Sequence, residues 1–246
     1  MINVHGVGPT DRVLAPGEDR TWVSVAQFEQ MLDLAVQREH VRITFDDGNA
    51  SDLEIALPRL LERGLTAEFF VLAGLLGEPG RLDADGVREL AKAGMPIGSH
   101  GWAHRDWRRI DDVQAQEEFT EAHRVIGEIV GEPVTTVAIP FGSYDRRVLR
   151  RLRQTGVNRV LTSDGGTART SAWLQPRNSL RHDMDAVWLT SVIDGRPAFQ
   201  QRARSFAARA VKRLRGGPPM IRVNSAVPSP HETDSDHEGV SEKSAR

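Results

Sequence analysis

Two adjacent carboxylates, Asp46 and Asp47, follow the short β-branched and aromatic run 41–45 and stand directly before a glycine. Consecutive side chains that leave a strand point in different directions, so the two acids need not serve one function. One carboxylate could bind a cation while its neighbour faces a reacting water. For this motif alone, the plainer alternative is a turn aspartate beside a solvated one.

Two histidines with metal-ligand spacing lie in the segment 99–107. His100 and His104 are four residues apart, so a helical turn or a tight loop brings both imidazoles to one side. Taken alone, they could also be surface or capping groups. With one aspartate, however, they supply three nitrogen and oxygen ligands and leave a position open, which is typical of catalytic zinc. Water bound there has a pKa lowered toward about 7, and the second aspartate could accept its proton.

The composition limits the ligands and partners that are available. The chain has 246 residues and no cysteine, so a metal would be held by histidine or acidic side chains. Lysine and arginine number 32 against 34 acidic residues, and the net charge of -2 gives no reason to expect a nucleic-acid partner. The length is typical of one large α/β domain.

Short apolar runs alternate with longer segments of helical period, which predicts strands joined by crossover helices. The expected strands are 1–6, 41–45, 66–72, 94–100, 135–140, 158–163 and, with a weaker pattern, 173–180. The expected helices are 24–37, 51–64, 83–94, 111–131 and 144–156, several of which end in glycine as a C-cap would.

The informative polar residues fall at the carboxyl ends of these strands. They are Asp46 and Asp47, Ser99 and His100, Phe141 and Gly142, and Ser163 and Asp164. In parallel barrels and open parallel sheets this end carries the active site, because its loops bring distant positions into one bowl. We therefore expect these residues to share one face of the fold.

Three motifs in this order resemble the polysaccharide deacetylases of the NodB-homology type, carbohydrate esterase family 4. They are "TFDDG", "SHGWAH" and "IPFGSYD", and the opening "INVHGVGP" with "VSVAQFEQMLD" also looks like the start of that domain. The resemblance implies an α/β fold, a distorted (β/α) barrel with seven strands. It also implies hydrolysis of acetyl groups on amino sugars with a divalent metal, most often zinc, with cobalt or nickel as alternatives.

The resemblance also assigns roles by position. Asp46 would be the general base, and the metal ligands would be Asp47, His100 and His104. In the third motif Pro140 matches and Phe141 takes the place of a tyrosine, whose backbone N–H helps to hold the oxyanion. Pro140, Gly142 and Trp102 would contact the substrate, and Trp102 with Trp107 could form a stacking platform or pack against the barrel.

Three positions depart from the family pattern. Gly101 stands where a small hydroxyl residue is usual, and the third-motif arginine falls on Ala138. The late histidine that serves as general acid has no clear counterpart. Arg177 could supply the guanidinium and His182 the imidazole, with a surface charge and a solvated loop histidine as the alternatives. His5 either lines the bowl or is a core histidine.

The C-terminal part has a different composition. Residues 198–215 predict a basic amphipathic helix that packs on the barrel or contacts an anionic membrane surface. Residues 216–246 are rich in proline, serine and charge, and we expect a disordered tail after a domain at 1–215. The start lacks a signal-peptide pattern, so we expect a cytoplasmic protein, with contact to the membrane surface as an option.

Taken together, these observations predict a metal-dependent deacetylase. The expected substrate is an N-acetylated, or alternatively O-acetylated, sugar, sugar nucleotide or lipid-linked glycan. Two alternatives remain open at this point. One is an amidohydrolase or deformylase of the same fold that acts on a small non-sugar amide. The other is a non-catalytic glycan-binding relative, against which the intact Asp46, Asp47, His100 and His104 argue, since binding alone needs no base beside a metal.

Overall fold

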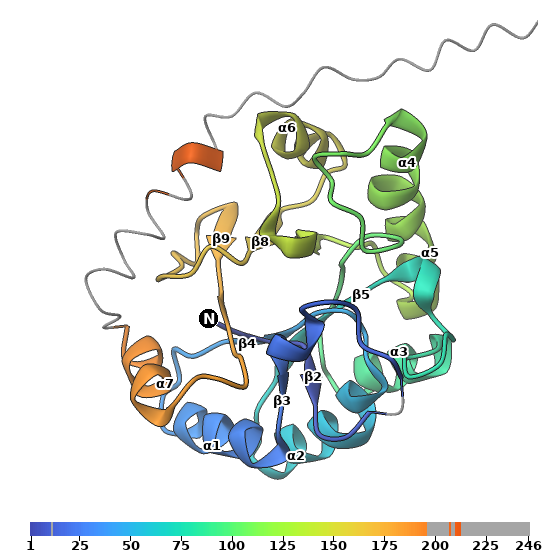
Figure 1. Cartoon of the computed structure of the whole chain (residues 1–246). Coiled ribbons are helices and arrows are strands. Elements are labelled where there is room, and N and C mark those ends of the chain that lie inside the picture. The colour runs from blue at the N-terminus through green and yellow to red at the C-terminus, as the bar shows by residue number, and fades with distance from the viewer. Residues whose placement is uncertain (11, 196–206, 208–209, 213–246) are drawn as a thin grey trace, which may run out of the picture.

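Parallel strands form the centre of the molecule, and the helices surround them (Figure 1). The structure is a computed structural model, and it describes residues 1–10, 12–195, 207 and 210–212. The strands are β1 (Ile2–Val4), β2 (Gly6–Val7), β3 (Trp22–Val23), β4 (Ile43–Phe45), β5 (Ala67–Val71), β6 (Ile97–Ser99), β7 (Thr136–Ala138), β8 (Arg159–Thr162), β9 (Leu174–Pro176) and β10 (Asn178–Ser179).

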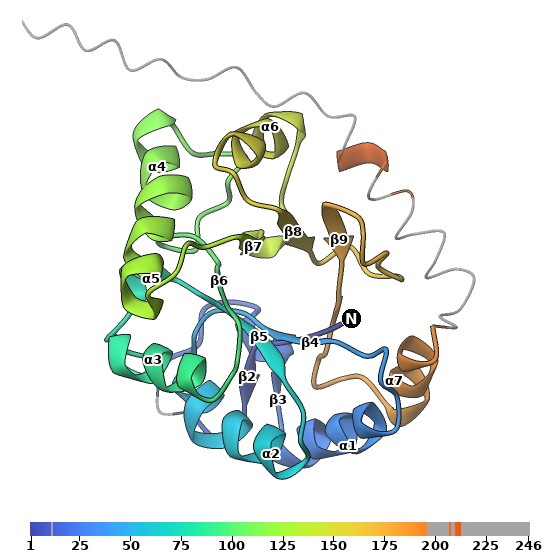
Figure 2. The same ribbon diagram turned by 180° about the vertical axis from the view of Figure 1, so that it is seen from behind.

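Eight of these strands form one sheet in the order β10-β1-β4-β5-β6-β7-β8-β9, with every pair parallel. Only Arg177 separates β9 from β10, so one segment pairs with β8 on one side and with β1 on the other. Seven segments of chain therefore nearly close a barrel (Figure 2). The contact between β6 and β7 is a single pair, Ser99 with Val137, which marks where the barrel is distorted.

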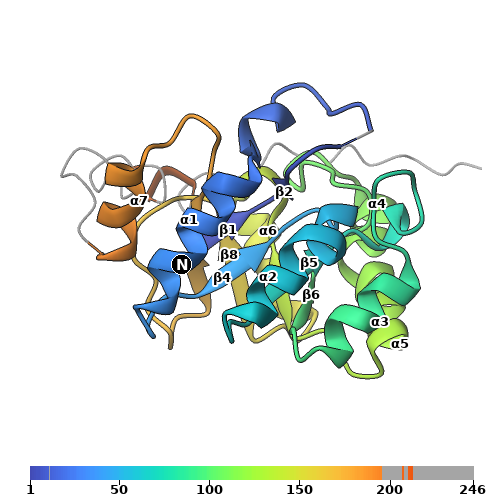
Figure 3. The same cartoon turned by 90° about the horizontal axis from the view of Figure 1, so that it is seen from below.

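Seven α-helices are present in the described residues, and several begin at capping side chains. They are α1 (Val25–Val36), α2 (Leu57–Glu62), α3 (Ala84–Lys92), α4 (Asp112–Gln116), α5 (Ala122–Val130), α6 (Arg146–Gln154) and α7 (Ala186–Ile193). Ser24 and Asp111 form capping boxes at α1 and α4, and Asp83 and Asp145 cap α3 and α6. Figure 3 shows α1, α2 and α3 along one flank of the barrel.

Side-chain alternation along β4 separates the outer core from the barrel interior. Phe45 packs outward between Phe28 of α1 and Phe69 of β5, with ring centroids 5.8 and 4.6 Å away. Its neighbours Thr44 and Asp46 take the opposite side, where both contact Asn3 of β1. Because side chains alternate in a strand, the same apolar packing that seats β4 also directs Asp46 into the barrel.

Four features extend beyond the expected elements. The strands β2 and β3 form a separate parallel pair, and helix α7 follows the barrel. The expected helices 51–64 and 111–131 each contain a five-residue π-helical turn, at Asp52–Ala56 and Glu117–Glu121. A π turn inserts an extra residue into a helix and is frequent at functional sites.

Only part of the C-terminal region for which the sequence makes predictions falls within the described residues. The domain limit expected near residue 215 and the disordered tail expected at 216–246 lie outside the described residues. Of the basic helix expected at 198–215, residues 207 and 210–212 are described and are helical. Across the described residues, no helix is both long and apolar enough to span a bilayer.

Candidate metal centre and catalytic pocket

A pocket of about 350 Å³ opens at the carboxyl end of the barrel strands. Its lining residues come from six strand ends, from the segment between β2 and β3 and from the loop between β5 and α3. They are His5, Ala15, Pro16, Gly17, Glu18, Thr21, Asp46, Asp47, Arg81, His100, His104, Phe141, Ser163 and Ser179. The predicted bowl at this end of the strands is therefore present. Two larger surface hollows near α6 contain none of these residues.

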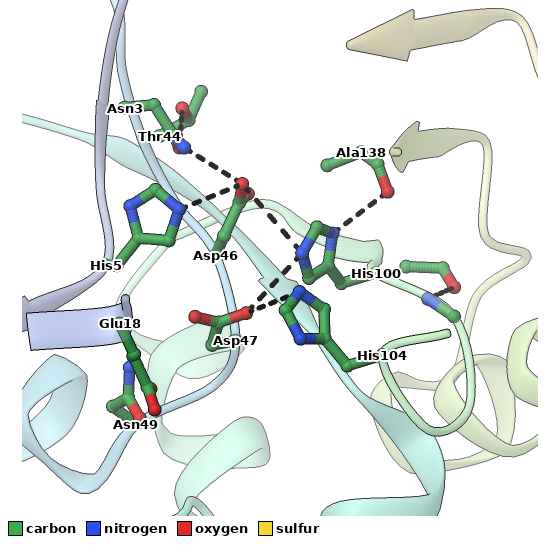
Figure 4. A network of polar contacts seen from close by, with 12 residues as sticks. Asn3, His5, Glu18, Thr44, Asp46, Asp47, Asn49, His100, His104 and Ala138 are labelled. Atoms are coloured by element: carbon green, nitrogen blue, oxygen red, sulfur yellow. Dashed lines mark hydrogen bonds and ion pairs between the residues drawn. The ribbon is translucent and has the colours of Figure 1, made fainter. Parts of the chain in front are cut away.

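Asp47, His100 and His104 face one another within this pocket (Figure 4). The Oδ1 atom of Asp47 lies 3.5 Å from Nε2 of His100 and 3.5 Å from Nε2 of His104. Asp47 has φ 78° and His104 has φ 53°, so both backbones adopt the left-handed conformation that non-glycine residues rarely take. Backbone strain at two of three converging side chains is typical of a functional site.

The three side chains fit a divalent metal ion. Asp47 is buried, and its Oδ1 has no hydrogen-bond partner among the described residues, which is costly unless a cation binds there. His100 directs Nδ1 to the Ala138 carbonyl, 2.9 Å away, and so presents Nε2 to the centre. Burial lowers the pKa of His100 to about 4, so its imidazole is neutral and able to ligate at neutral pH.

Asp46 lies beside this trio but has different partners. Arg177 donates from Nη1 and Nη2 to the two carboxylate oxygens at 2.6 and 2.7 Å, and Asn3 donates to Oδ2 at 2.9 Å. Arg177 and Asn3 are fully buried and Asp46 is 1% exposed. Burial raises the pKa of Asp46, but the Arg177 guanidinium and then His100 outweigh it, so the pKa lies well below its ordinary value. Asp46 is a fixed, ionised carboxylate.

Arg177 reaches Asp46 from the junction of β9 and β10, which supplies the guanidinium that Ala138 cannot. The structure thus places the Arg177 guanidinium against Asp46, the contact proposed for it from the sequence, although Arg177 itself does not line the pocket. His182 is exposed and lies elsewhere. Its backbone carbonyl accepts a hydrogen bond from the Gln27 side chain at the start of α1. His182 does not line the pocket.

The third motif forms a tight turn at the pocket wall. Pro140–Gly142 is a short 3-10 helix after β7, with Phe141 at φ 57° and ψ 5°. Pro140 and Gly142 are buried beneath the wall, whereas Phe141 is 64% exposed and its ring lies 4.2 Å from the His104 ring. The turn therefore places Phe141 beside the His104 imidazole at the pocket wall.

Of the two alternatives for Trp102 and Trp107, a stacking platform or packing against the barrel, the structure shows packing. Trp107 is 1% exposed and packs edge-on against Phe119, 4.8 Å between centroids, so the platform reading is wrong for this residue. Trp102 is partly buried and packs over Gly74, and it does not line the pocket. Both indoles are surrounded by the chain itself, because the loop that carries them folds back on the barrel.

Sequence reasoning missed two residues and left a third undecided. Asn3 has no recognisable motif, yet it holds both Asp46 and Arg177. His5 lines the pocket, with Nε2 3.9 Å from Oδ2 of Asp46, and its position just after the first strand was the available signal. Lys212 was unforeseen: its ammonium group donates to the Gly142 carbonyl at 2.7 Å and to Asp164 at 2.6 Å.

Comparison with known proteins identifies the family of the chain. Residues 34–160 match the family model for polysaccharide deacetylase, which is more than half of the chain. YxkH of Bacillus subtilis, provisionally described as a polysaccharide deacetylase, is 27% identical over 128 residues, which cover 52% of this chain and 46% of that protein. The peptidoglycan-N-acetylglucosamine deacetylase of Bacillus cereus is 26% identical over 108 residues, which cover 43% of this chain and 37% of that protein. The chain thus aligns with less than half of each of these relatives.

Solved structures share the fold. The deacetylase PplD of Streptococcus pyogenes, in complex with acetate, superposes with a TM-score of 0.65 at 20% identity over 78% of this chain and 96% of that one. The polysaccharide deacetylase BC0361 of Bacillus cereus superposes with a TM-score of 0.66 at 18% identity, over 78% of this chain and 67% of that one. At these identities the structures establish the distorted deacetylase barrel, and the family model establishes kinship. The chain belongs to the polysaccharide deacetylase family.

Proposed function

We propose that the protein is a metal-dependent hydrolase that removes an acetyl group from an N-acetylated sugar of a glycan. One observation carries the proposal. A buried carboxylate oxygen that has no hydrogen-bond partner among the described residues faces two imidazole nitrogens, and an arginine-held carboxylate lies directly beside them in the same pocket. A binding protein has no need for this second carboxylate, whereas a hydrolase needs a base there.

Asp47, His100 and His104 would hold the metal. A donor set of two imidazoles and one carboxylate suits zinc, and also cobalt or nickel, better than magnesium or calcium, which prefer oxygen ligands. When bound, such an ion supplies Lewis acidity: it lowers the pKa of a coordinated water and polarises a carbonyl. His100 and the two backbones in left-handed conformation hold these donors ready before the ion arrives.

Asp46 serves as the general base. It accepts a proton from the attacking water while the new C–O bond forms at the acetyl carbon. Arg177 and Asn3 fix the carboxylate, and the ion pair with Arg177 keeps it ionised down to acidic pH. The low pKa makes Asp46 a weaker base, but its two partners fix the orientation of the carboxylate. Orientation contributes more to lowering the reaction barrier when base and water must meet at hydrogen-bond distance.

Phe141 and His5 act on the oxyanion and on the leaving nitrogen. The Phe141 N–H, at the pocket wall, donates to the oxyanion of the tetrahedral intermediate. His5 is the imidazole of the pocket that lies outside the metal-ligand trio, and it donates a proton to the nitrogen as the C–N bond breaks. The products are acetate and the free amine. The complex of the Streptococcus pyogenes deacetylase with acetate supports this product assignment.

The test is acetate release by the protein after removal and replacement of metal. Chelation should abolish acetate release from N-acetylated oligosaccharides, sugar nucleotides or lipid-linked glycans, and zinc or cobalt should restore it with about one ion bound per chain. Release of formate from formylated amides in place of acetate would identify the amidohydrolase alternative. A protein that binds no ion after reconstitution would contradict the proposal.

A further inference from the structure

A buried glutamate outside the pocket organises the loop that carries His104. Glu118 is fully buried and lies in the π-helical turn Glu117–Glu121, between α4 and α5. Its Oε2 accepts hydrogen bonds from the Trp102 N–H at 2.8 Å and from the Trp107 indole at 3.0 Å, and its Oε1 accepts one from the Ala103 N–H at 3.1 Å. The carboxylate therefore binds successive amides between His100 and His104.

The two histidines of the trio are anchored very differently. His100 is held by its own backbone, whose N–H donates to Val71, and by its ring, whose Nδ1 contacts Ala138. Among the described residues, the polar partner of the His104 ring is Asp47, and the ring packs against Phe141. The orientation of His104 thus depends on the conformation of residues 101–103, and Glu118 fixes that conformation.

The same contact explains the unusual Gly101. Its φ of 94° is in the region that favours glycine, and a Cβ built there would clash with Oε2 of Glu118. The carboxylate fills the space that a side chain at this position would occupy. The π turn is what brings Glu118 this close, because it shifts the helix by one residue relative to the regular α-helix that the sequence predicts.

We propose that Glu118 is a positioning residue for the metal centre, which it serves by holding the 101–103 amides so that His104 faces Asp47 and His100 before metal binds. The inference rests on the proposed metal site. Glu118 touches neither the ion nor the substrate. Hydrogen-bonded groups behind metal ligands commonly raise metal affinity by about 10–100-fold, and this is the effect expected of Glu118.

The experiment is a cobalt titration of the full-length, metal-free protein, followed through the visible absorption of bound Co²⁺. Glu118→Gln keeps the shape but presents an NH₂ group to N–H donors, so it should bind Co²⁺ about 10–100-fold more weakly than wild type. At saturating Co²⁺, its acetate release should return to within about threefold of wild type, because base and oxyanion donor are untouched. Glu121→Gln is the matched control: Glu121 lies in the same π turn, contacts Arg124, and should leave Co²⁺ affinity unchanged.

Hydrogen exchange provides a second readout that does not depend on metal binding. In metal-free wild type the Trp102 and Ala103 amides should be protected, and in Glu118→Gln they should exchange faster while the strand amides keep their rates. If Glu118→Gln does not fold, Glu118→Asp retains the charge, cannot reach the amides, and should show the same loss. Equal cobalt affinities in wild type and variant, or unprotected amides in wild type, would overturn the role of Glu118. Absence of cobalt binding by wild type would instead refute the proposed metal site.

Discussion

At the scale of single residues, one strand end gives two adjacent aspartates opposite surroundings. Asp46 continues the inward alternation of β4 and meets Arg177 and Asn3 inside the barrel. Asp47 follows with a left-handed backbone, which turns its carboxylate to the two histidines. The proposed division of labour between base and ligand therefore follows from backbone geometry, since the two side chains are chemically identical.

Substitution of each aspartate by asparagine should separate these roles. Asp46→Asn keeps the shape but removes the proton acceptor, so turnover should fall about 10²–10⁴-fold while metal content stays near wild type. Asp47→Asn removes an anionic ligand, so metal affinity and turnover should fall together and added zinc should partly restore both. Metal stoichiometry and acetate release across a zinc titration measure the two effects. Loss of metal from Asp46→Asn, or normal turnover by it, would reverse the assignment.

Removal of Arg177 should change the pH dependence of the reaction. In Arg177→Gln, burial acts on Asp46 without the guanidinium, so the Asp46 pKa should rise. A general base is lost as pH falls through its pKa, and the acidic limb of the kcat profile should therefore move to higher pH in the variant. Thermal denaturation should accompany the measurement, because an unpaired buried carboxylate costs about 3–5 kcal/mol of stability. An unchanged acidic limb would show that Asp46 is not the base.

At the scale of elements, the turn Pro140–Gly142 is braced from a distant part of the chain. Lys212 donates to the Gly142 carbonyl, next to Phe141, and to Asp164, whose other oxygen accepts hydrogen bonds from Tyr144 and Thr162. The Asp164 side chain is fully buried, and Lys212 is its ion-pair partner among the described residues. Of the two settings expected for the basic helix, packing on the barrel or contact with an anionic membrane surface, these contacts of Lys212 agree with packing on the barrel.

Lys212→Ala should affect both stability and catalysis. It leaves a buried carboxylate without its cation and a turn carbonyl without its donor, so we expect a loss of about 1–3 kcal/mol and a reduction of kcat larger than any change in metal affinity. The exposed neighbour Val211 supplies the control, and Val211→Ala should be neutral in both assays. Denaturant unfolding and steady-state kinetics on the full-length protein measure these effects. If Lys212→Ala keeps the wild-type kcat, Lys212 does not support the catalytic conformation of the turn.

At the scale of the whole molecule, a histidine away from the pocket should set part of the acid sensitivity of the fold. His123 of α5 lies largely buried, and its Nε2 has no hydrogen-bond partner among the described residues. Burial lowers the pKa of His123 to about 4, below the ordinary value of 6.5. The unfolded chain therefore binds a proton that the folded chain rejects, so stability falls as pH decreases from 6.5 toward 4.

His123→Gln should remove this sensitivity. Between pH 7 and pH 4.5 the wild type should lose about 2 kcal/mol more stability than the variant, since each pKa unit corresponds to about 1.4 kcal/mol. At neutral pH His123 is unprotonated in both states and this contribution to the free energy of unfolding is absent. A stability difference between wild type and variant at that pH reports only packing. Urea unfolding of the metal-free protein at both pH values gives the comparison. Parallel losses in the two proteins would show that His123 is protonated without cost in the fold.

Much of the fold and half of the candidate site follow from the sequence alone. Every expected strand is present, because apolar runs and helical periods report locally which residues must leave water. Asp46, Asp47, His100 and His104 could be found because each stands at a strand end within a short motif. The resemblance then implied the barrel, and the family comparison confirms it.

Tertiary structure decided which side chains complete the site. Arg177 meets Asp46 across 131 positions because the segment of β9 and β10 closes the barrel against β1, and no local pattern encodes that pairing. Glu118 meets the His104 loop because a π turn changes the helix phase, which periodicity does not reveal. Periodic patterns specify the face that a residue occupies, whereas the partner on that face depends on how the elements pack together.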